Sequence, residues 1–140
     1  MAFKISLDLQ KHLLNGGIIA AIAGTSGTAG TATLNLYSGT QPANADAGTS
    51  GTLICTIAGI SWNTATNGTT GLASTGGYSG TALAAGTIGW GRMECVSDKG
   101  TCRIDGNAGS VGGEVWSTAR CIVGIGDTVN LVSADLYMVA

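Results

Sequence analysis

Charged side chains are scarce in this sequence of 140 residues. They make up 10% of the chain, where a typical globular protein has about 25%. So few charges exclude an acidic tail or a basic arm, and six Lys and Arg against eight Asp and Glu give a net charge of −2. Because no positive field is available to hold a phosphate backbone, we expect no nucleic-acid partner. Hydrophobic residues nevertheless reach 44%, so the chain is expected to fold rather than remain disordered.

The sequence also lacks a long apolar run. The most apolar stretch, residues 18–23, falls far short of the roughly 20 residues that a spanning helix needs, so we expect no membrane partner. The first 23 residues imitate a signal peptide, with Lys4 and Lys11 ahead of apolar residues. Asp8 in the basic region and the Asn-Gly-Gly interruption at 15–17 argue against secretion.

Signatures of catalysis and of cofactor binding are missing as well. The single histidine, His12, has no Ser and Asp partners that the sequence can place beside it, and no GxSxG motif occurs. The Gly-rich stretches at 24–30 and 76–80 lack both the P-loop lysine and the dinucleotide spacing. Glu94 and Glu114 belong to no EF-hand-like ladder of ligands. The sequence therefore predicts no enzyme, no catalytic residue and no cofactor.

Four cysteines are present, but no two lie close together in the sequence. Cys55, Cys95, Cys102 and Cys121 are separated by 40, 7 and 19 residues, whereas zinc sites usually contain a Cys pair two to four residues apart. We therefore expect no metal site, and small buried thiols are the default interpretation.

What the chain does contain is small residues: Gly, Ala, Thr and Ser make up just over half of it. Its length suits one domain, which we divide into an N-terminal helix and flexible arm at 1–30 and a body at 31–140. Ser6 can cap a helix over residues 7–14, which Asn-Gly-Gly would end, and GTSGTAG at 24–30 is typical of a flexible arm.

After the arm, short runs of β type follow one another between Gly, Asn and Ser residues. Leu34 and Leu36 alternate with polar residues, which indicates one apolar and one solvated face. This pattern predicts a mainly β fold, an antiparallel β-sandwich or a barrel-like body. The expected strands are 32–37, 52–58, 87–96, 101–106, 115–118, 121–123 and 128–138, the last with a bend near Ser133.

The most specific local prediction is a hairpin around Ser-Asp-Lys-Gly at 97–100. Its register places the following residues opposite one another: Cys95 and Cys102, Glu94 and Arg103, Met93 and Ile104, and Arg92 and Asp105. Two opposite-charge pairs and one apolar pair support this register. It also makes a cross-strand disulfide between Cys95 and Cys102 conceivable in an oxidising compartment.

Trp62, Trp90 and Trp116 are three of only seven aromatic residues. In a chain of small residues we expect them to anchor the core or an interface, because aromatic side chains bury the most area. A platform for stacking sugars is the alternative. The tetrapeptide Tyr-Ser-Gly-Thr occurs at 37–40 and again at 78–81, which indicates either a duplicated unit or low complexity.

Six segments of the chain form a recognisable series: TLNLYSGTQP at 33–42, GTLI at 51–54, GTIGWGR at 86–92, SDKGT at 97–101, DGNAG at 105–109 and GDTV at 126–129. Together they resemble a family of small virion proteins of tailed bacteriophages. In similar sequences the position of Gly91 often holds a larger residue. The resemblance implies a structural protein of the virion, assembled in the cytoplasm of the host bacterium, of the head-decoration (cement) type or a minor capsid component.

A physical argument favours self-association too. Glycine within a strand costs about 0.5–1 kcal/mol relative to alanine, and small side chains bury little apolar area. We therefore expect the protein to bind copies of itself and the major capsid protein. The candidate interface residues are Leu7, Leu13, Leu14, Ile18, Ile19, Ile22, Leu34, Leu36, Leu131 and Tyr137. The alternatives are a tail or neck component, and a glycan-binding adhesion module that uses Trp62 or Trp116.

Overall fold

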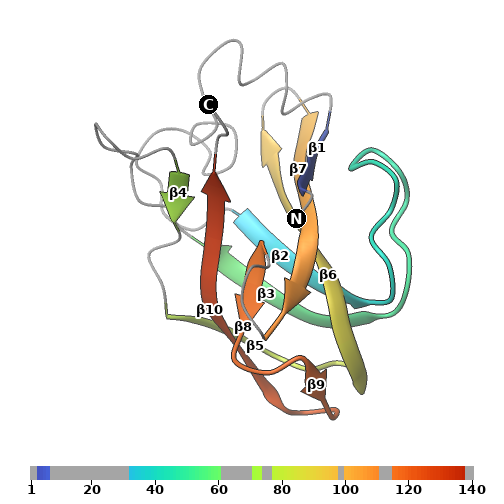
Figure 1. The fold of residues 1–140 in the computed structure, drawn as a ribbon, viewed down its shortest axis with the longest axis vertical. Coiled ribbons are helices and arrows are strands. Elements are labelled where there is room, and N and C mark those ends of the chain that lie inside the picture. Colours follow the sequence, from blue (N-terminus) through green and yellow to red (C-terminus); the bar gives the residue numbers. More distant parts are fainter. Residues whose placement is uncertain are drawn as a thin grey trace.

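The computed structural model describes residues 3–6, 32–60, 71–73, 77–97, 100–110 and 115–137 (Figure 1). These residues form ten strands and no helix, so the mainly β prediction is confirmed. The strands are β1 (Phe3–Ile5), β2 (Ala32–Ser38), β3 (Leu53–Ile60), β4 (Gly71–Ala73), β5 (Tyr78–Thr81), β6 (Gly86–Ser97), β7 (Gly100–Gly109), β8 (Trp116–Thr118), β9 (Ile122–Val123) and β10 (Thr128–Tyr137). The helix expected at 7–14 and the arm at 24–30 lie outside the described residues, whereas Phe3–Ile5 belong to the sheet.

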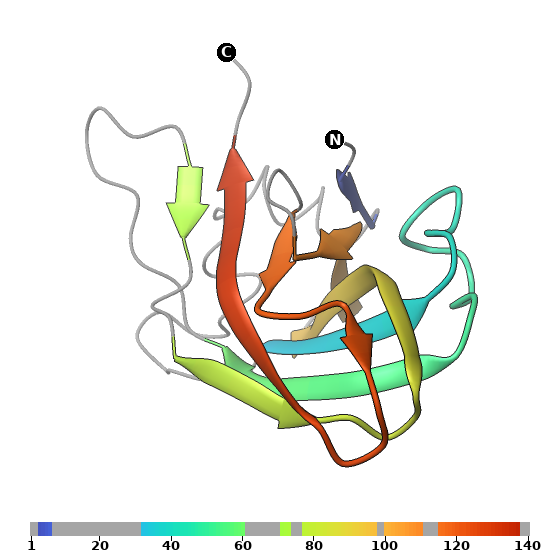
Figure 2. The same cartoon turned by 60° about the horizontal axis from the view of Figure 1, so that its bottom comes forward.

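The strands follow the order β3-β2-β6-β7-β8-β10-β4, with β1 added to β7, β5 to β10 and β9 to β6. All these pairs are antiparallel except β7 with β8. The two ends of the sheet approach each other, because Ala82 bridges to Cys55 and the N–H of Leu83 donates to Ile54 O at 2.7 Å. The sheet is therefore nearly closed and barrel-like, as Figure 2 shows.

The hairpin of β6 and β7 has the predicted register. Arg92 lies opposite Asp105, Glu94 opposite Arg103 and Cys95 opposite Cys102. The bend expected in the last strand is also present, since the pairing of β10 with β8 shifts between Leu131 and Ser133.

The core lies inside the barrel and is built by alternation along the strands. Leu34 and Leu36 of β2 point into it and are fully buried, as is Trp116 of β8. Two glycines in strands are required by this packing. A Cβ at Gly91 would lie 2.8 Å from Trp116 Cδ1, and a Cβ at Gly106 would lie 2.6 Å from Val115 Cβ. These glycines therefore let large neighbours approach the sheet closely.

The repeated tetrapeptide occupies two different settings. Its first copy ends β2 and turns at Gly39, whose φ is +80°. Its second copy is strand β5, where a Cβ at Gly80 would collide with the carbonyl oxygen of Thr56. The repeat therefore does not mark a duplicated strand-turn unit. Strands β1, β4 and β5 had no counterpart among the predicted strands.

Candidate functional site

The outer face of β2, β6 and β7 carries a cluster of polar side chains that register brings together. Arg92 and Asp105 form a bidentate ion pair, with Nε donating to Oδ1 at 2.7 Å and an Nη to Oδ2 at 2.8 Å. Their side chains are 4% and 0% exposed. The hydrogen bond to Asp105 raises the pKa of Arg92 above its ordinary value. Each oxygen of the carboxylate thus accepts from a guanidinium, which makes this pair structural rather than chemically available.

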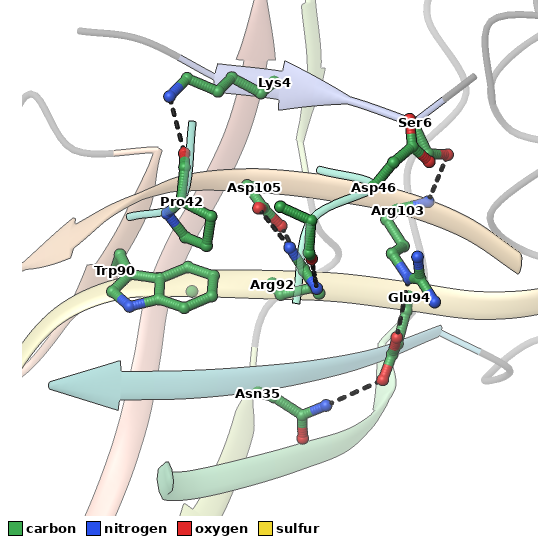
Figure 3. Close-up of polar contacts among 12 residues, drawn as sticks. Lys4, Ser6, Asn35, Pro42, Asp46, Trp90, Arg92, Glu94, Arg103 and Asp105 are labelled. Atoms are coloured by element: carbon green, nitrogen blue, oxygen red, sulfur yellow. Dashed lines mark hydrogen bonds and ion pairs between the residues drawn. The ribbon is translucent and has the colours of Figure 1, made fainter. Parts of the chain in front are cut away.

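Residues 39–52, here called the covering loop, close over this cluster (Figure 3). Three of its carbonyl oxygens accept hydrogen bonds from the sheet. Pro42 O accepts from Lys4 Nζ at 2.8 Å, Ala47 O from Arg92 at 3.0 Å, and Ser50 O from Trp90 Nε1 at 3.3 Å. The covering loop therefore binds two strands of the barrel at once.

Beneath the covering loop, Trp90 is completely buried although it lies on the outer face of the sheet. Its ring stacks on Tyr37 with centroids 4.6 Å apart and planes inclined by 15°. The guanidinium carbon of Arg92 lies 5.6 Å from the Trp90 ring centroid, within cation–π range. Burial raises the pKa of Tyr37. These residues form a small second core that the covering loop completes.

A more exposed polar ladder runs across the same face. Arg103 Nε lies 3.5 Å from Glu94 Oε2, Asn35 Nδ2 donates to Glu94 Oε1 at 3.2 Å, and Thr56 Oγ1 donates to Asn35 Oδ1 at 2.9 Å. Ion pairs exposed to this degree typically contribute 0 to about 1 kcal/mol. The ladder therefore adds cross-strand specificity more than stability.

The tryptophans in the described residues are core residues. Trp90 and Trp116 are 0% exposed, and Trp116 Nε1 donates to Gly91 O at 3.0 Å inside the barrel. Both side chains are thus buried, and Trp116 presents no surface on which a sugar could stack. Trp62 lies outside the described residues.

The candidate interface residues of the body need correction. Leu34, Leu36 and Leu131 are at most 4% exposed, because their strands turn these side chains into the barrel. They are core residues and cannot contact a neighbouring molecule. Tyr137 ends β10, with its side chain outside the described set. The other candidates also lie outside it: Leu7, Leu13, Leu14, Ile18, Ile19 and Ile22.

The cysteines offer little reactivity in the part of the chain that the structure describes. Burial raises the pKa of the Cys55 thiol, which keeps it protonated and inert. Cys121 is half-buried and its sulfur accepts a hydrogen bond from Ser110 Oγ at 3.4 Å. Cys102 is buried opposite Cys95, whose side chain lies outside the described residues. Among the residues described, no three His, Cys, Asp or Glu side chains gather where they could hold a metal ion.

The most unusual surface feature is a group of large apolar side chains at one end of the barrel. Leu83, Ile122 and Ile125, here called the apolar end, are 60%, 73% and 76% exposed. They lie on two adjoining segments, because Ala82 N donates to Asp127 O at 2.8 Å and Gly126 N to Ala82 O at 2.9 Å. Figure 1 shows β9 and the turn that follows it at the lower end of the barrel.

Backbone geometry explains why the apolar end is exposed. Ile122 belongs to the two-residue strand β9, whose Val123 points inward and is buried. Ile125 sits in the turn closed by the hydrogen bond from Asp127 N to Gly124 O at 3.1 Å. Sequence reasoning missed these residues, although an isoleucine between two glycines ahead of a Gly-Asp turn is an unusual residue for a solvated turn.

Among the described residues, no helix is long and apolar enough to cross a membrane. Comparison of the chain with protein-family models, with curated proteins and with solved structures found no match.

Proposed function

We propose that this protein is a non-catalytic structural component of a bacteriophage virion, and specifically a head-decoration protein that docks on the major capsid lattice together with copies of itself. The observation that carries the proposal is the apolar end on an otherwise weakly charged barrel. Exposed apolar groups that adjoin one another are typical of surfaces that bind other proteins.

The energetics suit a role in assembly. Fully burying a leucine or isoleucine side chain contributes about 1.5–3 kcal/mol, and each side chain of the apolar end still exposes most of its surface. Burying all three would therefore contribute a few kcal/mol per copy. Repetition over a lattice multiplies such a modest contact through avidity.

The polar residues of the body support a structural role in a different way. The buried charges of Arg92 and Asp105 bind each other, and Arg92 also donates a hydrogen bond to the covering loop at Ala47 O. These interactions hold the covering loop on the sheet. A catalytic site needs groups that are oriented but still available to a substrate. The Arg92–Asp105 pair has the opposite character, because the guanidinium and the carboxylate bind each other through two hydrogen bonds.

The variant Ile122→Asp/Ile125→Asp tests the proposal in a co-sedimentation assay. The assay uses purified capsids of the phage whose genome encodes this chain. We expect loss of binding with unchanged thermal stability, because both side chains are already exposed. Val132→Asp is the matched control, since Val132 is 61% exposed but lies on β10 away from the apolar end. Binding that survives the double substitution would remove the apolar end from the proposal.

Location in the particle is tested by quantitative mass spectrometry of purified virions. Hundreds of copies per particle support a shell protein. A few copies support the alternative of a tail or neck component, and absence from the particle refutes a virion role.

A further inference from the structure

The edge of β7 next to β1 is a binding site for an extended segment. β1 pairs with it through three residues, Phe3 opposite Gly106, Lys4 opposite Asp105 and Ile5 opposite Ile104. Ser6 continues the pairing, since its N–H donates to Arg103 O and its Oγ accepts from Arg103 N, both at 3.1 Å. Further along the same edge β8 pairs with Ala108 and Gly109, which bounds the site (Figure 1).

The site selects side chains as well as backbone. Lys4 reaches the covering loop through its hydrogen bond to Pro42 O (Figure 3), while Ile5 is partly buried and packs against the core. Without a strand here, the backbone groups of Arg103 and Asp105 that face this edge would lose their partners, since Ser6 N donates to Arg103 O and Lys4 lies opposite Asp105. Asp105 is completely buried, so a strand in this position keeps its backbone groups hydrogen-bonded.

Chain connectivity does not determine which copy supplies that occupant. Residues 7–31 join Ser6 to the start of β2, and 25 residues can span at most about 80–90 Å. A domain of this length has a radius of gyration of only about 14 Å. The β1 segment can therefore reach the β7 edge of an adjacent copy.

We propose that the β7 edge is a strand-acceptor site that joins copies of this protein, with β1 of one copy pairing with β7 of the next. This inference rests on the proposed assembly role and names the way in which siblings are linked. An exchanged strand makes the same contacts as one that stays in its own chain, so exchange adds an intermolecular link without a new interface. Docking side by side on a lattice raises the local concentration that favours it.

The register provides a direct test. Because Ser6 and Arg103 form a hydrogen-bonded pair, Ile5 and Ile104 form the adjacent non-hydrogen-bonded pair, in which Cα atoms approach to about 4.5 Å. The full-length variant Ile5→Cys/Ile104→Cys is prepared in two forms, one labelled with ¹⁵N and one unlabelled. The two forms are mixed in the unfolded state and refolded together under reducing conditions. The oligomer is then allowed to assemble, and the cysteines are oxidised. Peptide mass spectrometry then shows whether each disulfide between positions 5 and 104 joins chains of different isotope.

Strand exchange predicts that about half of these disulfides in the oligomer carry both isotopes. Disulfides of a single isotope only, in oligomers or in a chain that stays monomeric, would overturn the inference. The single variant Ile5→Cys identifies any bonds to native cysteines. Particles that contain the protein but yield only single-isotope disulfides would refute strand exchange alone, whereas absence from particles refutes the assembly role.

A second variant avoids any change to the core. Lys4→Pro removes the backbone N–H that faces Asp105, while Lys4→Ala keeps it. We expect Lys4→Pro to shift the oligomer to monomer in size-exclusion chromatography with light scattering, and Lys4→Ala to retain it. An unchanged oligomer in Lys4→Pro would contradict the proposal.

Discussion

Replacing Asp105 with alanine tests the buried ion pair most directly. Arg92 would keep only its hydrogen bond to Ala47 O, and its guanidinium would remain almost completely buried beside Trp90. Removing one partner of a buried pair typically costs about 3–5 kcal/mol, because the remaining charge is left without compensation. A whole domain is stable by only about 5–15 kcal/mol, so Asp105→Ala is expected to be severely destabilising.

The loss is measured by urea denaturation and by thermal unfolding, followed through tryptophan fluorescence. For a chain of this size, 1 kcal/mol corresponds to about 3–5 °C, so the melting temperature should fall by about 10–25 °C. Glu94→Ala is the matched control on the same hairpin, since the Glu94–Arg103 pair is 37% and 30% exposed and should contribute at most about 1 kcal/mol. Equal losses in the two variants would refute the reasoning.

A further variant separates the cost of an uncompensated buried charge from the cost of losing the shape and hydrogen bonds of the pair. In Arg92→Met/Asp105→Leu both charges are gone, and replacing a buried ion pair by apolar residues of similar volume is often neutral or stabilising. We therefore expect this double variant to be more stable than Asp105→Ala. If it were equally unstable, the pair would matter for its shape and hydrogen bonds and not for the uncompensated charge.

Two other predictions concern the packing and the pH dependence of the same sheet. Gly91→Ala should cost about 1–3 kcal/mol, because its Cβ would overlap Trp116, whereas Gly48→Ala, with nothing within 4 Å, should be nearly neutral in the same denaturation assay. The raised pKa of Tyr37 means that the folded state holds the phenolic proton more tightly than the unfolded state. This contribution to the free energy of unfolding is fully present below the ordinary tyrosine pKa of about 10 and is lost as the pH rises above it. The free energy of unfolding is measured against pH for the natural protein and for Tyr37→Phe. An equal loss at high pH in both proteins would contradict the assignment to Tyr37.

The local sequence determined the strands that alternate and the hairpin that joins two of them. Asp and Gly at the turn, together with opposite charges at matching distances on either side, specify the register of β6 and β7 without help from the rest of the chain. Leu34 and Leu36 likewise indicate β2 and its inward face. These features depend on residues within about 15 positions of one another, so the local sequence is sufficient to predict them.

Only the tertiary structure decided which side chains are buried and which segments cover them. Leu34 and Ile122 are both large aliphatic residues in strands, yet one is fully buried and the other is 73% exposed. Trp90 is buried on the outer face because a loop that begins two residues after Tyr37 folds back over it. Short strands such as β1 and β5 have little pattern of their own and exist because distant strands offer them an edge. Burial depends on contacts between segments far apart in the chain, and the periodicity within one segment cannot predict those contacts.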